Sequence, residues 1–285
     1  MAAIRRDFRL RPREAGMTGF SAEWLALRER HDIAARNPDV LAAVTASLES
    51  APSVHVTDLA CGAGSTLRTL HARLPAQQHW DLIDNDPALL AIAGRTSVPE
   101  DIELNTVQFD LSRDLDTALD RKTNLITISA LLDLVSLAWL DRFLRQVAVR
   151  ALPVYAALTY DGRVDLSPID PFDTAMIAAV NAHQRTDKGF GPALGPTAAQ
   201  AAIGGFEAQG YAIIQGQSDW MIGPNDHAMQ IELLAGWAGT AREMGTLSDA
   251  DITGWLTRRK AAVSQKPSSI RVGHVDVFAT PRAMR

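Results

Sequence analysis

Small residues at alternate positions separate a short apolar segment from a predicted helix. Residues 58–64 read Asp-Leu-Ala-Cys-Gly-Ala-Gly. A ligand can approach the backbone closely only where no large side chain intervenes, and a helix that begins just beyond the turn offers unpaired N–H groups. This segment therefore predicts a turn that binds a nucleotide.

Two common nucleotide-binding motifs do not fit this turn. The dinucleotide fingerprint G-x-G-x-x-G, started at Gly62, would require glycine where Leu67 stands, and that glycine allows close packing of the helix beside the pyrophosphate. A Walker loop requires Lys followed by Ser or Thr, and no such pair follows the turn. NAD and P-loop nucleotides are therefore disfavoured.

Two more carboxylates follow predicted strands. Asp84 comes directly after residues 80–83, and Asp110 follows residues 105–109. The carboxyl ends of parallel strands meet at one edge of a sheet, where ligands of open α/β sheets bind. We expect both carboxylates to converge there with Asp58, although each of the three taken singly could be a helix cap or a turn residue.

The elements that must position these residues alternate along the chain. Two helices fit residues 21–50, and the second begins at Asn37-Pro38-Asp39, where Asn can cap and Pro suits the first helical turn. Predicted strands cover 54–57, 80–83, 105–109, 125–129, 154–160, 211–217 and 272–279, and helices cover 65–74, 136–144, 173–182, 197–210 and much of 226–264. This alternation predicts an α/β fold with a parallel sheet covered on both faces. Residues 162–196 interrupt it with glycines and prolines, which is typical of a lid or binding loop.

The first turn resembles that of the class I S-adenosylmethionine-dependent methyltransferases. Asp58, Ala60, Gly62 and Gly64 match the family's acidic residue followed by small residues, with Ala60 where the family has its first glycine. The resemblance implies S-adenosyl-L-methionine as cofactor, with Asp84 on the ribose hydroxyls. It also implies cofactor contacts from further residues: Asn85, Asp110 (at the adenine amino group), Leu111, Ser129 and, as the partner of the methionine carboxylate, Arg28. Arg36 is another arginine of this N-terminal region that could take the same role, and a charged helix face is the alternative explanation of Arg28.

The resemblance also implies a fold class. We expect a doubly wound, mostly parallel seven-stranded sheet with helices on both faces, N-terminal helices, and an insertion after the fifth strand. A single methyltransferase domain is predicted over residues 1–285. It comprises N-terminal helices in 1–50, the cofactor-binding core in 51–163, a candidate substrate lid in 164–196, and the C-terminal part of the sheet and helices in 197–285.

In this fold, the segments after the fourth and fifth strands face the transferred methyl group. Asp133 and Asp161 are therefore candidate general bases, each with a turn or helix entry as the alternative, and His183 in the insertion is a third. Candidate substrate contacts are Tyr160, Arg163, Asn181, Arg185 and Lys188. Metal-dependent catechol-type O-methyltransferases have Asn where Gly162 follows Asp161, so no metal is predicted.

Composition narrows the function further. The net charge of −5 provides no global positive field for a nucleic acid, and residues 5–13, although basic, are expected to form a solvated arm. One cysteine and no long apolar run indicate a cytoplasmic protein without a membrane partner. We expect methyl transfer to a small-molecule nucleophile, at O or N rather than C. A nucleic-acid methyltransferase and a non-catalytic S-adenosylmethionine-binding protein remain the alternatives, and the sequence leaves the oligomeric state open.

Overall fold

The computed structural model describes residues 20–265 and 267–282, so the basic segment 5–13 lies outside the described residues. Its first two helices are α1 (Ala22–Ala35) and α2 (Pro38–Leu48). Asn37 caps α2 as predicted, because its side chain accepts hydrogen bonds from the N–H groups of Asp39 and Val40. The junction between the two helices is thus a defined bend at Arg36 and Asn37.

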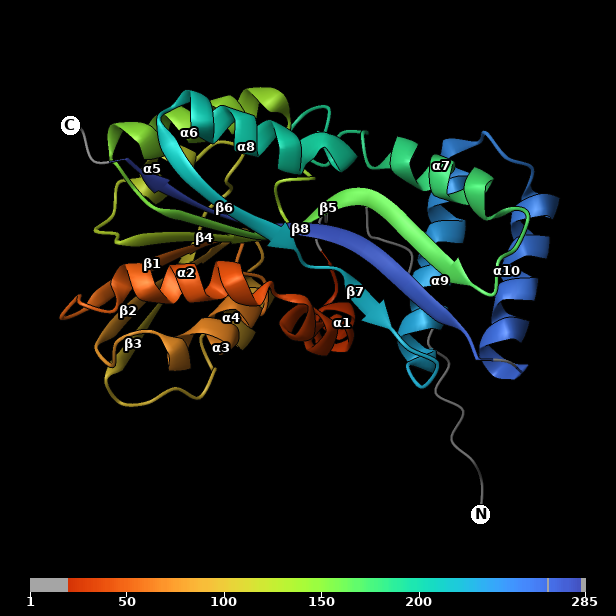
Figure 1. Cartoon of the computed structure of the whole chain (residues 1–285), viewed down its shortest axis with the longest axis horizontal. Helices are drawn as coiled ribbons and strands as arrows, with labels where there is room; N and C mark the ends of the chain where they lie inside the picture. The colour runs from red at the N-terminus through yellow and green to blue at the C-terminus, as the bar shows by residue number, and fades with distance from the viewer. Residues whose placement is uncertain (1–19, 266, 283–285) are drawn as a thin grey trace, which may run out of the picture.

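Eight strands form one sheet in the described part of the chain (Figure 1). The strands are β1 (Val54–Leu59), β2 (Gln78–Asp84), β3 (Ile102–Gln108), β4 (Leu125–Ser129), β5 (Val154–Ser167), β6 (Tyr211–Gln217), β7 (Trp220–Ile222) and β8 (Ser269–Pro281). Their order is β3-β2-β1-β4-β5-β8-β6, with β7 also paired to β8. Neighbours from β3 to β5 are parallel and β8 is antiparallel to both of its neighbours, which confirms the predicted fold class. The strand order reverses between β1 and β4.

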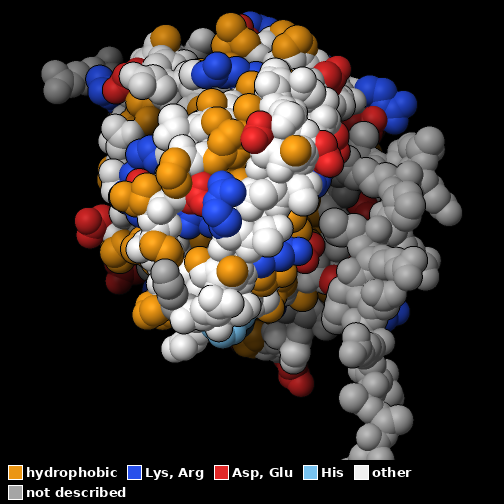
Figure 2. All heavy atoms as spheres, turned by 90° about the vertical axis from the view of Figure 1, so that its right-hand side faces the viewer, with side chains coloured by type: hydrophobic (Ala, Val, Ile, Leu, Met, Phe, Trp, Pro, Cys, Tyr) orange, Lys and Arg blue, Asp and Glu red, His pale blue; other side chains and the backbone are white. Residues whose placement is uncertain are grey.

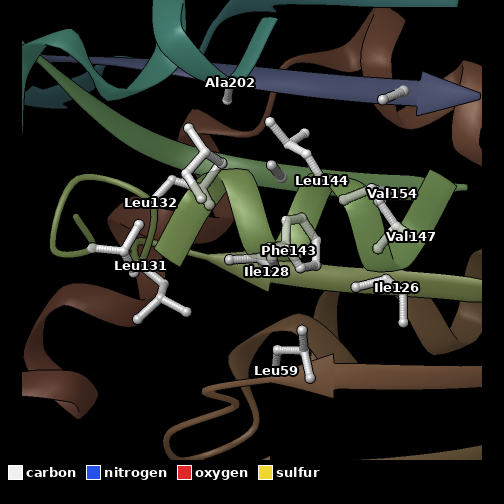
Figure 3. Close-up of a cluster of buried hydrophobic side chains, with 14 of the residues drawn as sticks. Leu59, Ile126, Ile128, Leu131, Leu132, Phe143, Leu144, Val147, Val154 and Ala202 are labelled. Atoms are coloured by element: carbon white, nitrogen blue, oxygen red, sulfur yellow. The ribbon is translucent and has the colours of Figure 1, made fainter. Parts of the chain in front are cut away.

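Helices cover both faces of the parallel strands. One face carries α2 with α3 (Ser65–Leu70), a 3-10 turn (His71–Arg73) and α4 (Pro87–Ala93), and the other carries α5 (Leu115–Leu119), α6 (Leu137–Val149) and α8 (Ala198–Ala208) (Figure 1). On the second face, Phe143, Leu144 and Val147 of α6 pack over Ile126 and Ile128 of β4 (Figure 3). Spacings of three and four residues bring the α6 side chains onto one side of the helix. The hydrophobic cores on the two faces of the sheet hold the strands in place, and with them the side chains at the strand ends.

The sequence prediction was wrong about where β5 ends. The strand continues past Tyr160 to Ser167, and β8 begins at Ser269, because the two strands pair with each other far beyond the rest of the sheet. Register shifts interrupt that pairing, one of them between Tyr160 and Val164. The interrupted polar and apolar alternation of residues 161–165 hides the strand in the sequence, and the pairing partner lies about a hundred residues away.

This extension of β5 and β8 has a core of its own. Helices α7 (Asp173–His183), α9 (His227–Met244) and α10 (Asp249–Gln265) surround it together with β7, at the right in Figure 1. Trp255 of α10 is fully buried there, and its indole N–H donates to Asp173. The helix predicted at residues 173–182 is therefore confirmed as α7.

No helix in the described ranges is long and apolar enough to cross a membrane.

Candidate cofactor and substrate site

The glycine turn joins β1 to α3 through three residues in the left-handed backbone region. Their φ angles are 54° at Ala60, 53° at Gly62 and 85° at Gly64. Ala60 is strained in this conformation, which explains why the family pattern has glycine at its position. Helix α1 lies directly over the turn, since a Cβ added at Gly62 would be 3.4 Å from Leu25 Cδ1. A ligand at this turn would therefore lie against α1.

Asp84 connects the turn to the end of β2. Its Oδ2 accepts from the N–H of Gly62 at 2.8 Å and its Oδ1 from the N–H of Asp86 at 3.0 Å. Burial raises the pKa of Asp84, whereas these backbone N–H groups oppose the rise. The predicted ribose-binding carboxylate is thus placed beside the turn, with acceptor capacity left on each oxygen.

Asp58 is the most unusual carboxylate at this edge. It is 1% exposed, and its Oδ1 accepts from the hydroxyl of Thr127 at 2.7 Å. Its Oδ2 is buried without a hydrogen-bond partner. Burial raises the pKa of Asp58 to about 7, against the lowering effects of Thr127 and Arg36. A cationic donor at Oδ2 would favour the ionised form.

Arg36, rather than the Arg28 that the sequence prediction favoured, lies at the end of β4. From the bend after α1, it donates to the Ser129 hydroxyl at 3.0 Å and to the Tyr155 hydroxyl at 3.4 Å. Its Nε is buried and has no hydrogen-bond partner. Burial alone would lower the pKa of Arg36, but Tyr155 and Asp276 raise it overall. Ser129, predicted to bind cofactor, thus holds this arginine.

Arg28 has other partners. It forms a buried ion pair with Asp32 at 2.9 Å, one turn further along α1, and its guanidinium lies 4.9 Å from the centre of the Trp220 ring. The indole N–H of Trp220 donates to the same carboxylate at 3.0 Å. Arg28 and Arg36 are each four residues from Asp32, so spacing alone does not tell which arginine pairs with it.

The third predicted carboxylate, Asp110, lies after β3, next to the end of β2. Its Oδ1 accepts from the N–H and the hydroxyl of Ser112, and its Oδ2 pairs with Arg113 at 3.1 Å. The hydrogen bond from the Ser112 hydroxyl is the main reason that the pKa of Asp110 is lowered. Beside it, the carbonyl of Leu111 accepts from Trp139, and the carbonyl of Asn85 accepts from Gln108. All three predicted carboxylates therefore occupy one edge of the sheet.

On the substrate side, Asp133 follows β4 as predicted. It is 6% exposed, and its Oδ1 is buried without a hydrogen-bond partner. Burial raises the pKa of Asp133 to about 6, opposed by backbone N–H groups and by the charge of Arg28. Tyr160 lies close enough for Asp133 to affect its pKa, and its hydroxyl donates to Asn181 at 2.7 Å. Asp133, Tyr160 and Asn181 thus belong to one region.

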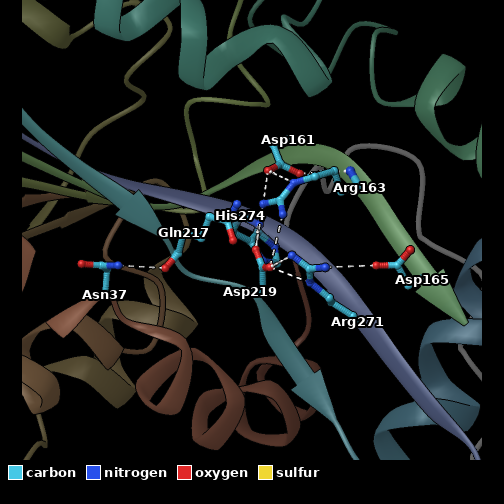
Figure 4. Close-up of polar contacts among 8 residues, drawn as sticks. All are labelled: Asn37, Asp161, Arg163, Asp165, Gln217, Asp219, Arg271 and His274. Carbon is cyan, nitrogen blue, oxygen red and sulfur yellow. Dashed lines mark hydrogen bonds and ion pairs between the residues drawn. The ribbon is translucent and has the colours of Figure 1, made fainter. Parts of the chain in front are cut away.

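Asp161 and Arg163 form part of an ion-pair cluster on β5 and β8 (Figure 4). Arg163 donates to Asp161 through Nε at 2.6 Å and to Asp219 through Nη2 at 2.9 Å. Arg271 donates to Asp219 at 2.7 Å, and the N–H of His274 donates to it at 3.1 Å. Asp161 is thus bound by an arginine, whereas Asp133 Oδ1 has no hydrogen-bond partner.

The remaining predicted residues lie around the end of α7. His183 Nε2 is 3.0 Å from Glu243 Oε2 and its Nδ1 is 3.0 Å from Lys188 Nζ. The Cγ of Arg185 packs so closely on Gly195 that a Cβ there would be 3.2 Å away. His183 and Lys188 therefore interact with each other and with the end of α9.

One further residue of this region carried no recognised sequence signal. His274 on β8 is 5% exposed, and its Nδ1 is buried without a hydrogen-bond partner. Burial lowers the pKa of His274 to about 3, so its imidazole is neutral at physiological pH. Its ring lies 6.1 Å from that of Tyr160 and 4.9 Å from that of Trp220. In the described ranges, no group of three or more His, Cys, Asp and Glu residues is arranged to hold a metal ion.

Comparison with known proteins identifies the central part of the chain. Residues 56–152, from β1 to the turn before β5, match the family model of a methyltransferase domain. These residues form a methyltransferase domain. The match confirms the predicted class I S-adenosylmethionine-dependent methyltransferase, and with it the enzyme class and the cofactor. No curated protein shows significant similarity to the chain.

Solved structures resemble the methyltransferase and its extension at low sequence identity. A cyclopropane-fatty-acyl-phospholipid synthase-like protein from Lactobacillus casei superposes with a TM-score of 0.53 at 13% identity, covering 91% of this chain and 94% of its own. A putative type II methyltransferase from Anaeromyxobacter dehalogenans gives 0.49 at 16% identity, with 87% and 98% covered. A SAM-dependent methyltransferase from Thiobacillus denitrificans, crystallised with S-adenosyl-L-homocysteine, gives 0.43 at 15% identity, with 92% and 99% covered. The similarity to the Lactobacillus casei structure supports the fold.

Proposed function

We propose that this methyltransferase transfers the methyl group of S-adenosylmethionine to an oxygen or nitrogen atom of a small molecule. The observation that carries the cofactor part of the proposal is a pair of unpartnered atoms of opposite chemistry. Arg36 Nε is a buried charged donor, and Asp58 Oδ2 is a buried acceptor. Both lie at the reversal of strand order between β1 and β4, where ligands of such sheets bind.

These two atoms suit the amino-acid end of the cofactor. An α-amino acid carries a carboxylate and an ammonium group on one carbon, so it can accept from Arg36 and donate to Asp58 together. Asp58 accepts from Thr127, and Arg36 donates to Ser129, two residues further along β4. The charge of Arg36 lowers the pKa of Asp58, and none of the ion pairs in the described residues joins the two side chains. A zwitterion between them would satisfy both unpartnered atoms.

The adenosyl end would then follow the strand ends toward β3. Asp84 can accept from the two ribose hydroxyls because each of its oxygens has one backbone donor and further acceptor capacity. Asp110 is partly exposed at the next strand end, where it can accept from the adenine amino group. In the proposed arrangement Asn85 and Leu111, which are adjacent to these carboxylates, line the adenosyl group.

When bound, S-adenosylmethionine supplies a methyl group activated by its sulfonium. The protein's own contribution is alignment, which can provide about 7–11 kcal/mol, and a positioned base, which adds about 10²–10⁴-fold. Asp133 suits the base because a carboxylate with a pKa of about 6 is mostly ionised at neutral pH. A nucleophile that must lose a proton, such as a hydroxyl or an amine, has use for such a base. In this proposal Tyr160 and Asn181 contact the substrate.

A small substrate fits the charges around Asp133. Arg28 is paired with Asp32, and Arg163 with Asp161 and Asp219, so these cations are already compensated. On the face shown in Figure 2, Lys and Arg side chains are scattered among acidic and hydrophobic ones and form no continuous basic patch. A nucleic-acid substrate would require several uncompensated cations along its backbone.

Calorimetry with S-adenosylhomocysteine, the product cofactor, tests the cofactor part of the proposal. We expect binding to the wild type, with affinity weakened more than tenfold by Asp84→Ala. Asp120→Ala is the matched control, because the side chain of Asp120 is 83% exposed at the end of α5. Absence of binding to the folded wild-type protein would refute the proposal.

Crystals grown with the product cofactor test the substrate part. We expect Asp133 to lie on the side of the sulfur atom that is open to a methyl acceptor. A cofactor whose sulfur faces away from Asp133 and Tyr160 would refute the assignment of these residues, although the cofactor site would stand.

A further inference from the structure

A fully buried carboxylate lies outside the methyltransferase motif, on antiparallel strand β8. Asp276 is 0% exposed and accepts three hydrogen bonds. Its Oδ2 accepts from the N–H of Asn37 at 3.0 Å and from the hydroxyl of Tyr155 at 3.1 Å. Its Oδ1 accepts from the N–H of Leu158 at 2.8 Å. One carboxylate thus binds the bend between α1 and α2 and two positions of β5.

Tyr155 links this carboxylate to Arg36, the arginine of the proposed cofactor site whose Nε has no partner. Its hydroxyl accepts from Arg36 Nη1 at 3.4 Å and donates to Asp276, and the guanidinium lies 5.7 Å from the centre of its ring. Asp276 also fixes the backbone next to Arg36 by binding the N–H of Asn37. Asp276 therefore restrains Arg36 in two ways, through the backbone at Asn37 and through the hydroxyl of Tyr155.

Asp276 also binds an irregular position within β5, at Leu158. Leu158 has a φ of 53°, a conformation that is strained for a bulky side chain. It lies in the register shift between Ala156 and Thr159 of β5. The preceding residue, Ala157, pairs with Ser129 of β4, and Ser129 accepts from Arg36. One buried carboxylate therefore holds both the strained position of β5 and, through Asn37 and Tyr155, the arginine.

We infer that Tyr155 and Asp276 are positioning residues for the amino-acid end of the cofactor. They hold the guanidinium of Arg36 so that its Nε faces the carboxylate of the ligand, and the charge of Asp276 compensates the buried arginine when no ligand is bound. This inference rests on the proposed function, since it takes the ligand of Arg36 to be S-adenosylmethionine. Buried groups that orient a charged ligand partner affect affinity without touching the ligand.

Two ligands that differ only at the amino-acid end provide the test. S-adenosylhomocysteine has the α-carboxylate and ammonium groups, whereas 5′-methylthioadenosine keeps the adenosyl group and lacks them. We expect Tyr155→Phe and Asp276→Asn to weaken S-adenosylhomocysteine about tenfold or more. The affinity for 5′-methylthioadenosine should stay within about twofold of the wild type, because Asp84 and the glycine turn are unchanged. Calorimetry measures both constants for each variant.

Tyr211→Phe is the matched control. Tyr211 is also a buried tyrosine, and its hydroxyl donates to the carbonyls of Val147 and Leu152 at 2.9 and 3.0 Å, on the other face of the sheet. It should leave the ratio of the two affinities unchanged. Tyr155→Phe keeps the ring and its packing, so it carries the test even if Asp276→Asn does not fold.

The outcomes separate this inference from the proposed function. Equal weakening of both ligands by Tyr155→Phe would show a merely structural role and overturn the inference, and so would unchanged affinity for both. A wild type that binds both ligands equally well would also overturn it, because the amino-acid end would then not be recognised. Failure of the wild type to bind either ligand would refute the proposed function itself.

Discussion

Replacing Asp58 by asparagine should make the protein more stable and a weaker cofactor binder. The folded protein holds this carboxyl with a pKa of about 7, raised by burial from a reference value of 3.8. The difference of about three units corresponds to about 4 kcal/mol, an order-of-magnitude figure, at 1.36 kcal/mol per unit. Asparagine cannot ionise, and its carbonyl oxygen can still accept from Thr127.

The sign of the effect depends on pH. Below about pH 4 the carboxyl is protonated in both the folded and the unfolded chain, so it does not oppose folding. As the pH rises toward 7 the unfolded chain ionises first, and the folded state loses relative stability. The free energy of unfolding of Asp58→Asn should therefore exceed that of the wild type by about 4 kcal/mol at pH 8 and by little at pH 4.

Urea titrations at pH 4, 6 and 8, followed by tryptophan fluorescence, measure this difference directly. Asp120→Asn, at an exposed position, controls for the loss of one negative charge. In the same preparations the variant should bind S-adenosylhomocysteine at least about tenfold more weakly at pH 8, because the ligand ammonium loses its partner. A stability difference that stays constant from pH 4 to 8 would refute the reasoning about the buried charge.

Three further predictions concern the base, the core and the extension. With any acceptor that the wild type methylates, the rate of methyl transfer should fall below about pH 6, because Asp133 is then protonated. The variant Asp133→Asn should lose this pH dependence and transfer the methyl group about 10²-fold or more slowly. A pH profile that the substitution leaves unchanged would exclude Asp133 as the base. Phe143→Ala should lower the free energy of unfolding by about 3–5 kcal/mol, measured by urea titration, because Phe143 is fully buried; a loss below 1 kcal/mol would contradict the packing. Asp219→Asn should lower the free energy of unfolding by about 2 kcal/mol at pH 7 and by less near pH 3. The reason is that Arg271 and Arg163 lower the pKa of Asp219 against the effect of its burial. A loss of stability that does not shrink in acid would refute an ionic role for Asp219.

Local patterns were sufficient to bring the proposed cofactor residues to one edge of the sheet. The acid and small-residue turn at residues 58–64 and the carboxylates Asp84 and Asp110 lie at successive strand ends, so a strand prediction also places them in space. The fold followed from the same patterns, because alternating strands and helices permit few topologies. The choice between two arginines did not follow in this way, since both lie in or next to the same helix.

Contacts between segments that are distant in the sequence could not be predicted from such local patterns. The pairing of β5 with β8 joins residues more than a hundred positions apart, and it extends both strands beyond their apolar segments. Its signal in the sequence was slight: His274 and Asp276 are two residues apart, so they lie on one face of a strand whose neighbours are apolar. Polar residues on a buried strand face have to be satisfied, and their partners cannot be predicted from spacing alone.

The distribution of buried charge explains why this edge favours a zwitterionic ligand over a simple ion. Arg36 is compensated through Tyr155 by Asp276, on the side away from the glycine turn. The pKa of Asp58 is raised to about 7, so a fraction of this carboxyl group is still protonated at neutral pH. An anion alone would satisfy Arg36 and leave Asp58 as it is, whereas a cation alone would satisfy Asp58 and leave Arg36 Nε without an acceptor. A ligand that carries both charges a short distance apart satisfies both groups, and binding it should release a proton from Asp58 below pH 7.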